Sequence, residues 1–425
     1  MAEDWTDMWK DLGLDLEKHD VLMGALGPLY LEWFTDQPNR PETMGYYDFV
    51  ISEVHGLRIK ELLDHKANGG TVVGTFCLFV PEEVIVALGG VAVGLCAGAD
   101  FSVPIAEAEL PRNLCPLIKS FYGFKLGKIC PYFESADVVV GETTCDGKKK
   151  AYELLGKIHP TYVMEVPNKK GPADRELWRA ELDDFIAAME KTTGNKLTEE
   201  NLAAAVKKVN AKRRAIKRVH ELRWNDPAPI SGKDALLIMQ ISFYDDMDRF
   251  TQKTNEVADE LEKRVAAGEG VFDKGTPRLM ISGTPMAIPN WKVHQVIETS
   301  GAAVVAEEMC TGFRYYKNTV AEDAKTLEEM KEALLDQYMG INCACFTPNE
   351  ARLEDIDYLY KNSHAQGIIH ATLSFCTPYL VEQGTVKKFT DDLGIPMLAL
   401  ETDYSDGDVG QLKTRVEALL EQVSS

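Results

Sequence analysis

Apolar and polar positions follow two patterns along the chain, short apolar runs typical of buried strands and longer runs with helical spacing. Strands are predicted over 71–76, 91–95, 137–142 and 161–166, with helices over 81–88, 111–121 and 147–158. A second series predicts strands over 278–282, 302–306, 367–373 and 395–400, with helices over 291–299, 326–338, 352–365, 379–393 and 411–422. Strands that alternate with helices indicate parallel sheets covered by helices on both faces.

The segments outside these two series have a helical pattern. Residues 1–68 read as helices, and three long helices are predicted over 174–193, 198–224 and 232–267. The sequence therefore predicts an α/β protein with two doubly wound parallel-sheet domains, an N-terminal helical segment and a helical insertion. We place the boundaries at 1–68, 69–171, 172–272 and 273–425.

Composition excludes several classes of function. The chain has 425 residues, 45% of them hydrophobic, and a net charge of −21, which disfavours binding to nucleic acid. Its start lacks the features of a secretory signal, and glycines interrupt its most apolar run at 84–99. We expect a cytoplasmic protein without a membrane span. The sequence contains no P-loop, no HExxH zinc motif and no CxxC pair.

Four of the nine cysteines lie where a predicted strand ends and a helix begins. These are Cys77, Cys145, Cys310 and Cys376. Carboxyl ends of parallel strands share one edge of a sheet, where ligands bind, and helix starts favour anions. Two such domains facing each other bring all four thiols to one cleft. The alternative interpretation is four ordinary buried thiols.

The other cysteines have weaker sequence contexts. Cys115 is predicted in the first turns of a helix, and INCACFTPNEAR places Cys343 and Cys345 at a strand-to-loop junction. Cys345 is preferred as a site residue because it lies nearer the TPN turn, with Cys343 as the alternative. Cys96 and Cys130 are expected to be structural, since no helix start that resembles those of the other four follows them directly.

Charged residues give no catalytic assignment. Four groups near strand ends are possible proton donors, and spacing singles out none of them: Glu142, Glu307, Glu308 and His370. The loop 283–290 follows a strand and is either a wall of the cleft or a simple turn. One predicted helix is basic and reads as a solvated face or as a docking patch for a partner: Lys207, Lys208, Lys212, Arg213, Arg214, Lys217, Arg218 and Arg223.

Three motifs together carry a family resemblance. TTCDGKKKAYELL, LSFCTPY and ETDYSDGDVGQLKTRVEALLE resemble the 2-hydroxyacyl-CoA dehydratase and benzoyl-CoA reductase superfamily. The resemblance implies that Cys77, Cys145 and Cys376 hold one 4Fe–4S cluster. The additional Cys115, Cys310 and Cys345 make the set similar to that of the double-cubane cluster proteins, in which an 8Fe–9S cluster has six terminal sites for thiolates.

The same resemblance implies an activity. A separate homodimeric activator ATPase with its own 4Fe–4S cluster supplies low-potential electrons, and this chain, as a homodimer, reduces a small molecule at its cluster. Two alternatives stay open: a 2-hydroxyacyl-CoA dehydratase subunit with a single 4Fe–4S cluster, and a non-catalytic iron–sulfur electron carrier.

Overall fold

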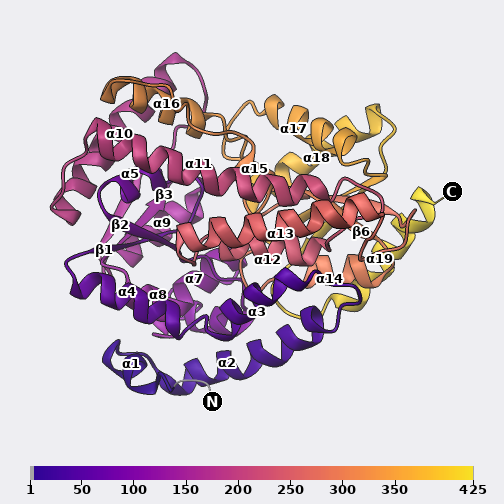
Figure 1. Ribbon diagram of the computed structural model, residues 1–425, viewed down its shortest axis with the longest axis horizontal. Coiled ribbons are helices and arrows are strands. Elements are labelled where there is room, and N and C mark those ends of the chain that lie inside the picture. Colours follow the sequence, from indigo (N-terminus) through magenta and orange to yellow (C-terminus); the bar gives the residue numbers. More distant parts are fainter. Residues whose placement is uncertain (1–3, 425) are drawn as a thin grey trace.

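The computed structural model describes residues 4–424, so the predicted segments 1–68 and 273–425 are seen from residue 4 and up to residue 424. The N-terminal segment is helical, as predicted, and runs along one side of the molecule (Figure 1). The segment also packs against the second half of the chain, because the rings of Tyr30 and Phe34 contact Trp291. Its elements are α1 (Thr6–Asp11), α2 (Leu16–Tyr30), η1 (Leu31–Thr35), η2 (Glu42–Met44), α3 (Gly45–Ser52) and α4 (Leu57–Ala67).

The first α/β unit contains a four-stranded parallel sheet in the order β2-β1-β3-β4. Every residue of β3 is buried, as expected of a parallel strand covered on both faces. The strands are β1 (Thr71–Thr75), β2 (Gly90–Gly94), β3 (Val138–Glu142) and β4 (Thr161–Met164). The helices are α5 (Glu82–Ala87), η3 (Asp100–Ser102), α6 (Val103–Ala106), α7 (Pro116–Leu126), α8 (Pro131–Ser135) and α9 (Asp146–Leu155).

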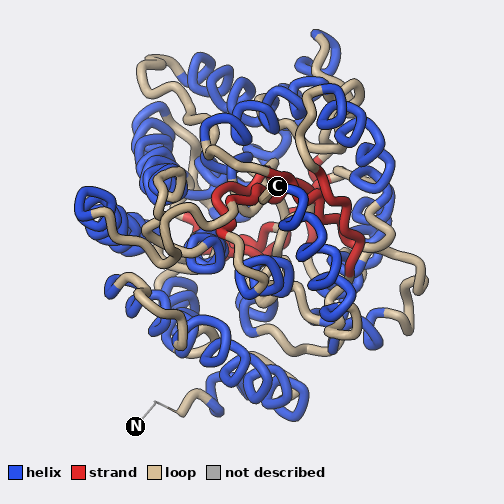
Figure 2. Tube along the Cα trace, turned by 90° about the vertical axis from the view of Figure 1, so that its right-hand side faces the viewer, coloured by secondary structure: helices blue, strands red, loops and turns tan. Residues whose placement is uncertain are grey.

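The second α/β unit repeats this architecture, with a parallel sheet in the order β6-β5-β7-β8. The strands are β5 (Arg278–Gly283), β6 (Ala303–Glu308), β7 (Gly367–Leu373) and β8 (Met397–Thr402). The helices are α14 (Lys292–Thr299), α15 (Phe313–Tyr316), α16 (Leu327–Met339), α17 (Glu350–Asn362), α18 (Thr377–Asp392) and α19 (Val409–Val423). Figure 2 shows the strands enclosed by helices, which confirms the predicted α/β class.

The helical insertion connects the two sheets and contains α10 (Pro172–Thr193), α11 (Glu199–Leu222), α12 (Gly232–Ile241) and α13 (Met247–Ala267). The prediction of one helix over 232–267 was wrong, because the chain breaks between α12 and α13. The Asp246 carboxylate caps α13 by accepting from the amides of Asp248 and Arg249, at 3.1 and 3.0 Å. The Phe243 carbonyl accepts from the Gly94 amide at 2.7 Å, which ties the break to β2.

A second correction concerns the helix predicted over 111–121. The structure has α7 at Pro116–Leu126 instead, so the helix begins at Pro116 and not at Pro111. Proline suits the first turn of a helix, and both prolines offered that signal. The shift places Cys115 immediately before the helix, at its N-cap. Among residues 4–424 there is no helix with the length and apolarity that crossing a membrane requires.

Candidate iron–sulfur site

The four strand-end cysteines occupy the predicted places. Cys77 and Cys145 follow β1 and β3 in the first sheet, and Cys310 and Cys376 follow β6 and β7 in the second. Cys145 and Cys376 are the N-cap residues of α9 and α18, as expected. The expectation of an immediate helix start was wrong for Cys77 and Cys310, because turns separate them from α5 and α15.

The structure brings seven thiols together in two groups. In the first, side-chain interactions link Cys77 to Cys310, Cys310 to Cys343, and Cys343 to Cys345. In the second, Cys115 interacts with Cys376, and Cys145 lies near enough to Cys115 to feel its charge. Each group draws on both halves of the chain, and Cys145 also feels Cys343. The seven thiols therefore share one region between the two sheets.

Neighbouring thiols shift each other's protonation. Its interaction with Cys310 lowers the pKa of Cys77 to about 6, and the interaction with Cys376 lowers the pKa of Cys115. Burial raises the pKa of Cys145 to about 11. Buried thiols at such close quarters do not all ionise without a cation to balance their charge.

Two basic side chains lie beside the thiols. The Arg314 guanidinium donates to the Cys310 sulfur at 3.8 Å and is held by the Glu308 carboxylate at 2.5 Å. It also donates to the Tyr379 hydroxyl, which lies 3.5 Å from the Cys343 sulfur. The Lys148 amide donates to the Cys145 sulfur at 3.4 Å, and its ammonium pairs with Glu142. These donors favour negative charge on the sulfurs.

The segment with Cys343 and Cys345 is not the predicted strand end. It is a loop between α16 and α17, and both residues lie in it. Cys343 is buried and interacts directly with Cys310, whereas Cys345 is half-buried and reaches the group through Cys343. The geometry therefore brings both alternatives into the same group.

Cys96 and Cys130 have different surroundings. The Cys96 thiol donates to the Phe76 carbonyl at 2.9 Å, and burial raises its pKa to about 12. Contrary to the sequence-based expectation, a helix does begin directly after Cys130, which is the N-cap of α8. Burial raises the pKa of Cys130 to about 11. Both environments suit structural thiols.

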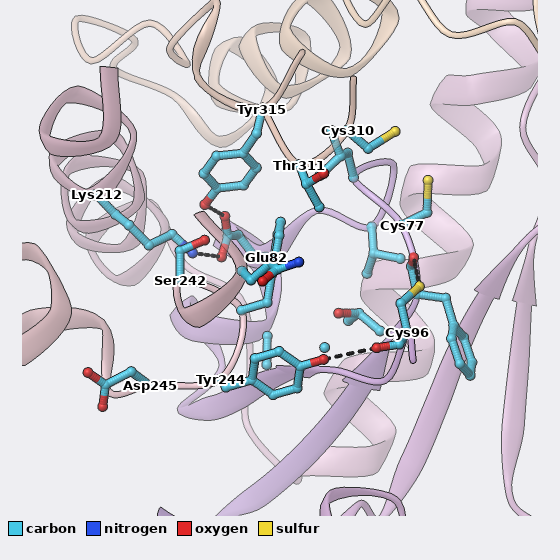
Figure 3. A pocket seen from close by; sticks show the side chains of 18 of the residues that line it. Cys77, Glu82, Cys96, Lys212, Ser242, Tyr244, Asp245, Cys310, Thr311 and Tyr315 are labelled. Atoms are coloured by element: carbon cyan, nitrogen blue, oxygen red, sulfur yellow. Dashed lines mark hydrogen bonds and ion pairs between the residues drawn. The ribbon is translucent and has the colours of Figure 1, made fainter. Parts of the chain in front are cut away.

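A cavity of about 180 Å³ reaches the first thiol group. Cys77 and Cys310 line it together with Cys96, as Figure 3 shows. Its wall also includes residues of the α12–α13 break (Ser242, Phe243, Tyr244, Asp245 and Asp246) and residues of the loop 283–290 (Pro285, Ala287 and Ile288). That loop is thus part of the cavity wall, and the break in the predicted helix supplies another part.

The four possible proton donors do not face this cavity. Within residues 4–424, none of Glu142, Glu307, Glu308 and His370 is among its lining residues. Glu307 is buried and pairs with Arg223 at 2.5 Å. Glu308 is buried between Arg314 and Arg352, and Glu142 pairs with Lys148. The arrangement of these three carboxylates is typical of structural ion pairs in the core.

The basic helix is not a continuous basic patch: some of its cations lie on a solvated outer face, such as Lys207 and Arg214, and others are buried. In α11, Lys212 and Arg213 are buried and pair with Glu82 and Glu83 of α5, at 2.5 and 2.6 Å. Arg223, just after α11, is also fully buried. The outer members are paired as well: Lys208 with Asp248, Arg214 with Glu322, Lys217 with Glu221, and Arg218 with Asp259 and Glu262. Acidic partners distant in sequence could not be anticipated from the helix alone.

Comparison with known proteins decides the family. Residues 77–423 match the family model described as 2-hydroxyglutaryl-CoA dehydratase, D-component. The chain belongs to this family. It is 38% identical to a putative dehydratase subunit of Escherichia coli K12, YjiM, over 88% of this chain and 97% of that protein.

More distant relatives have names that include both dehydratases and a reductase. The chain is 23% identical to the (R)-phenyllactyl-CoA dehydratase beta subunit of Clostridium sporogenes, over 85% of this chain and 94% of that one. It is 21% identical to one of the subunits of benzoyl-CoA reductase from Thauera aromatica, over 83% and 90%. This membership confirms the resemblance drawn from the three sequence motifs.

Proposed function

We propose that this chain is a cytoplasmic, ATP-dependent reductase of small molecules that holds a double-cubane 8Fe–9S cluster. The observation that carries the proposal is the gathering of thiols from both halves of the chain into two groups. A single cubane with three protein ligands leaves four of these seven thiols without a role. Six thiolates match the terminal sites of two cubanes, and we propose Cys77, Cys310 and Cys345 for one and Cys115, Cys145 and Cys376 for the other. This division separates Cys77 from Cys145 and Cys376, with which the family resemblance grouped it.

The chemistry of the donors fits an iron–sulfur cluster. Thiolates are the usual ligands of such clusters, and metal coordination deprotonates thiols that otherwise share protons. Within the described part of the chain, no three His, Cys, Asp or Glu side chains are placed to hold one metal ion. A cluster does not require that, because its thiolates bind different irons. Arg314 and the Lys148 amide would donate to ligating sulfurs and so tune the potential. When bound, the cluster would supply low-potential electrons.

The choice between Cys343 and Cys345 stays open in this proposal. We retain Cys345 as the ligand, with Cys343 as the alternative, since both belong to the first group. The iron contents of C343S and C345S, compared side by side, distinguish them. The ligand is the cysteine whose replacement lowers the iron content.

The second candidate is a dehydratase subunit that acts on a 2-hydroxyacyl-CoA with one 4Fe–4S cluster. The names of its relatives favour this candidate. The cavity favours the reductase, because about 180 Å³ is smaller than the ~300–1,000 Å³ of sites for drug-sized ligands. A CoA thioester exceeds that size. The third candidate, a non-catalytic electron carrier, needs no substrate cavity.

The proposal requires partners that the chain itself does not provide. It includes a separate homodimeric 4Fe–4S activator ATPase as electron donor, in keeping with a sequence that has no P-loop. It also includes a homodimer of this chain. The dehydratase candidate instead expects an unlike partner subunit.

Turnover assays separate the three candidates. Oxygen-free protein is mixed with the activator and ATP and given either acetylene or (R)-2-hydroxyglutaryl-CoA. The proposal expects ethylene from acetylene, a two-electron and two-proton reduction, and no dehydration. Dehydration of the thioester supports the second candidate. Electron delivery to a protein acceptor without either product supports the third, and both of these results contradict the proposal.

A further inference from the structure

A buried ion pair lines the cavity between α11 and α5. The Lys212 ammonium lies 2.5 Å from the Glu82 carboxylate, and the Lys212 side chain is only 2% exposed. The other oxygen of that carboxylate accepts a hydrogen bond from the Tyr315 hydroxyl. Figure 3 shows Lys212 and Tyr315 approaching the same carboxylate from two sides. Glu82 therefore fixes the position of the ammonium at the cavity wall.

This ion pair faces the first thiol group across the cavity. Lys212, Glu82, Cys77 and Cys310 all line the cavity, with the ion pair and the two thiols on opposite sides in Figure 3. The cavity volume of about 180 Å³ is below the ~300–1,000 Å³ of sites for drug-sized ligands. A molecule that fills so small a space contacts both walls. Its reducible atoms then lie between the thiols and the ammonium.

We propose that Lys212 is the proton donor to the substrate reduced in this cavity, and that Glu82 is its positioning residue. The inference rests on the proposed function. In the step, an N–H bond of the ammonium breaks and an X–H bond forms on the substrate, which gains two electrons from the reduced cluster. The amine of Lys212 then takes a proton from solvent, and a second transfer by the same route completes a two-electron, two-proton reduction.

Two tyrosines and an arginine of the cavity wall are poorer proton donors. The hydroxyls of Tyr244 and Tyr315 donate to the Cys96 carbonyl and to Glu82, and burial raises the pKa of both. Arg213 is paired with Glu83, and a guanidinium does not release its proton in proteins. Burial lowers the pKa of Lys212, which makes its ammonium the readier acid.

Solvent can restore the proton through the mouth of the same cavity. Lys208, one turn before Lys212 on α11, lines the cavity with its side chain 35% exposed. Asp246 at the start of α13 also lines it and is half-buried. Lys212 thus lies between the solvent-exposed mouth of the cavity and the thiols.

Two substitutions separate proton donation from a structural role. K212R keeps the positive charge beside Glu82 but cannot give up its proton. The double variant E82Q/K212M removes both charges, so no unpaired carboxylate is left buried. K217R is the matched control, because Lys217 is on the same helix and pairs with Glu221 outside the cavity. K148R tests whether a second lysine of the cavity wall, which pairs with Glu142, is the donor instead.

The readouts are iron content, unfolding temperature, the electron-paramagnetic signal after ATP-driven reduction, and ethylene formation from acetylene. K212R is expected to match wild type in the first three and to form ethylene at least ~100-fold more slowly, the scale of general acid catalysis. The double variant is expected to be equally inactive, whereas K217R stays active.

Several results would overturn the inference. One is ethylene formation by K212R or the double variant above a tenth of the wild-type rate, since K212R keeps a purely structural ion pair and the double variant leaves no unpaired charge. Loss of iron from both variants would show that Lys212 has a structural role. An inactive K148R together with an active K212R would assign proton donation to Lys148. If the wild-type protein itself binds no cluster or forms no ethylene, the proposed function is wrong, and the inference, which rests on it, is wrong as well.

Discussion

Serine at position 145 is expected to remove at least half of the iron and of the visible absorption from oxygen-free protein. Cys145 ends β3, caps α9 and accepts from the Lys148 amide at 3.4 Å. In the proposed cluster its thiolate holds an iron in the group with Cys115 and Cys376. A serine hydroxyl fits the space but is a far poorer ligand for iron than a thiolate. Iron and sulfide analysis with an absorption spectrum measures the effect.

Cys130 provides the matched control for this experiment. It too is the N-cap of a helix, and its thiol is buried. C130S is therefore expected to keep its full iron content. If C145S retains its iron and its absorption spectrum is unchanged, the assignment of Cys145 as a ligand is contradicted. Equal losses from both variants would point to general instability.

Replacing Arg314 with methionine is expected to lower the free energy of unfolding by about 3 kcal/mol, since breaking a buried ion pair costs ~3–5 kcal/mol. The Arg314 side chain is fully buried and pairs with Glu308 at 2.5 Å. Arg352 remains beside Glu308 at 3.0 Å, which keeps the effect near the lower end. Urea unfolding of the variant and of wild type, under the same oxygen-free conditions, measures the difference.

Arg314 also contacts the thiol group, so R314M has a second expected effect. Its guanidinium donates to the Cys310 sulfur and to Tyr379, and the variant should hold less iron than wild type. R218M is the control, because Arg218 forms ion pairs on the surface of α11. Exposed pairs contribute ~0–1 kcal/mol, so R218M should unfold close to wild type. An R314M variant as stable as R218M contradicts the structural role given to Arg314.

The sequence predicted the parts of the site that depend on strand ends. The apolar runs before Cys77, Cys145, Cys310 and Cys376 located all four, because burial on both faces leaves a clear signal in parallel strands. The alternation of strands and helices predicted two parallel sheets. The structure adds that both sheets have the same strand order. Local sequence patterns were therefore sufficient to locate the strands and the cysteines that follow them.

The remaining features depend on contacts that are distant in sequence. No local pattern distinguished Pro116 from Pro111 as the helix start, so the N-cap position of Cys115 was missed. The break between α12 and α13 is tied to β2 through Phe243, and the cations of α11 are buried by acids of α5. Lys212 was accordingly predicted as part of a surface, although it lines the cavity.

The most direct test of the account is the amount of iron and acid-labile sulfide bound by oxygen-free wild-type protein. The six proposed ligands predict about eight irons per chain, the content of two cubanes. About four irons would indicate a single cubane and favour the dehydratase candidate. A chain without bound iron would contradict the assignment of the thiols altogether.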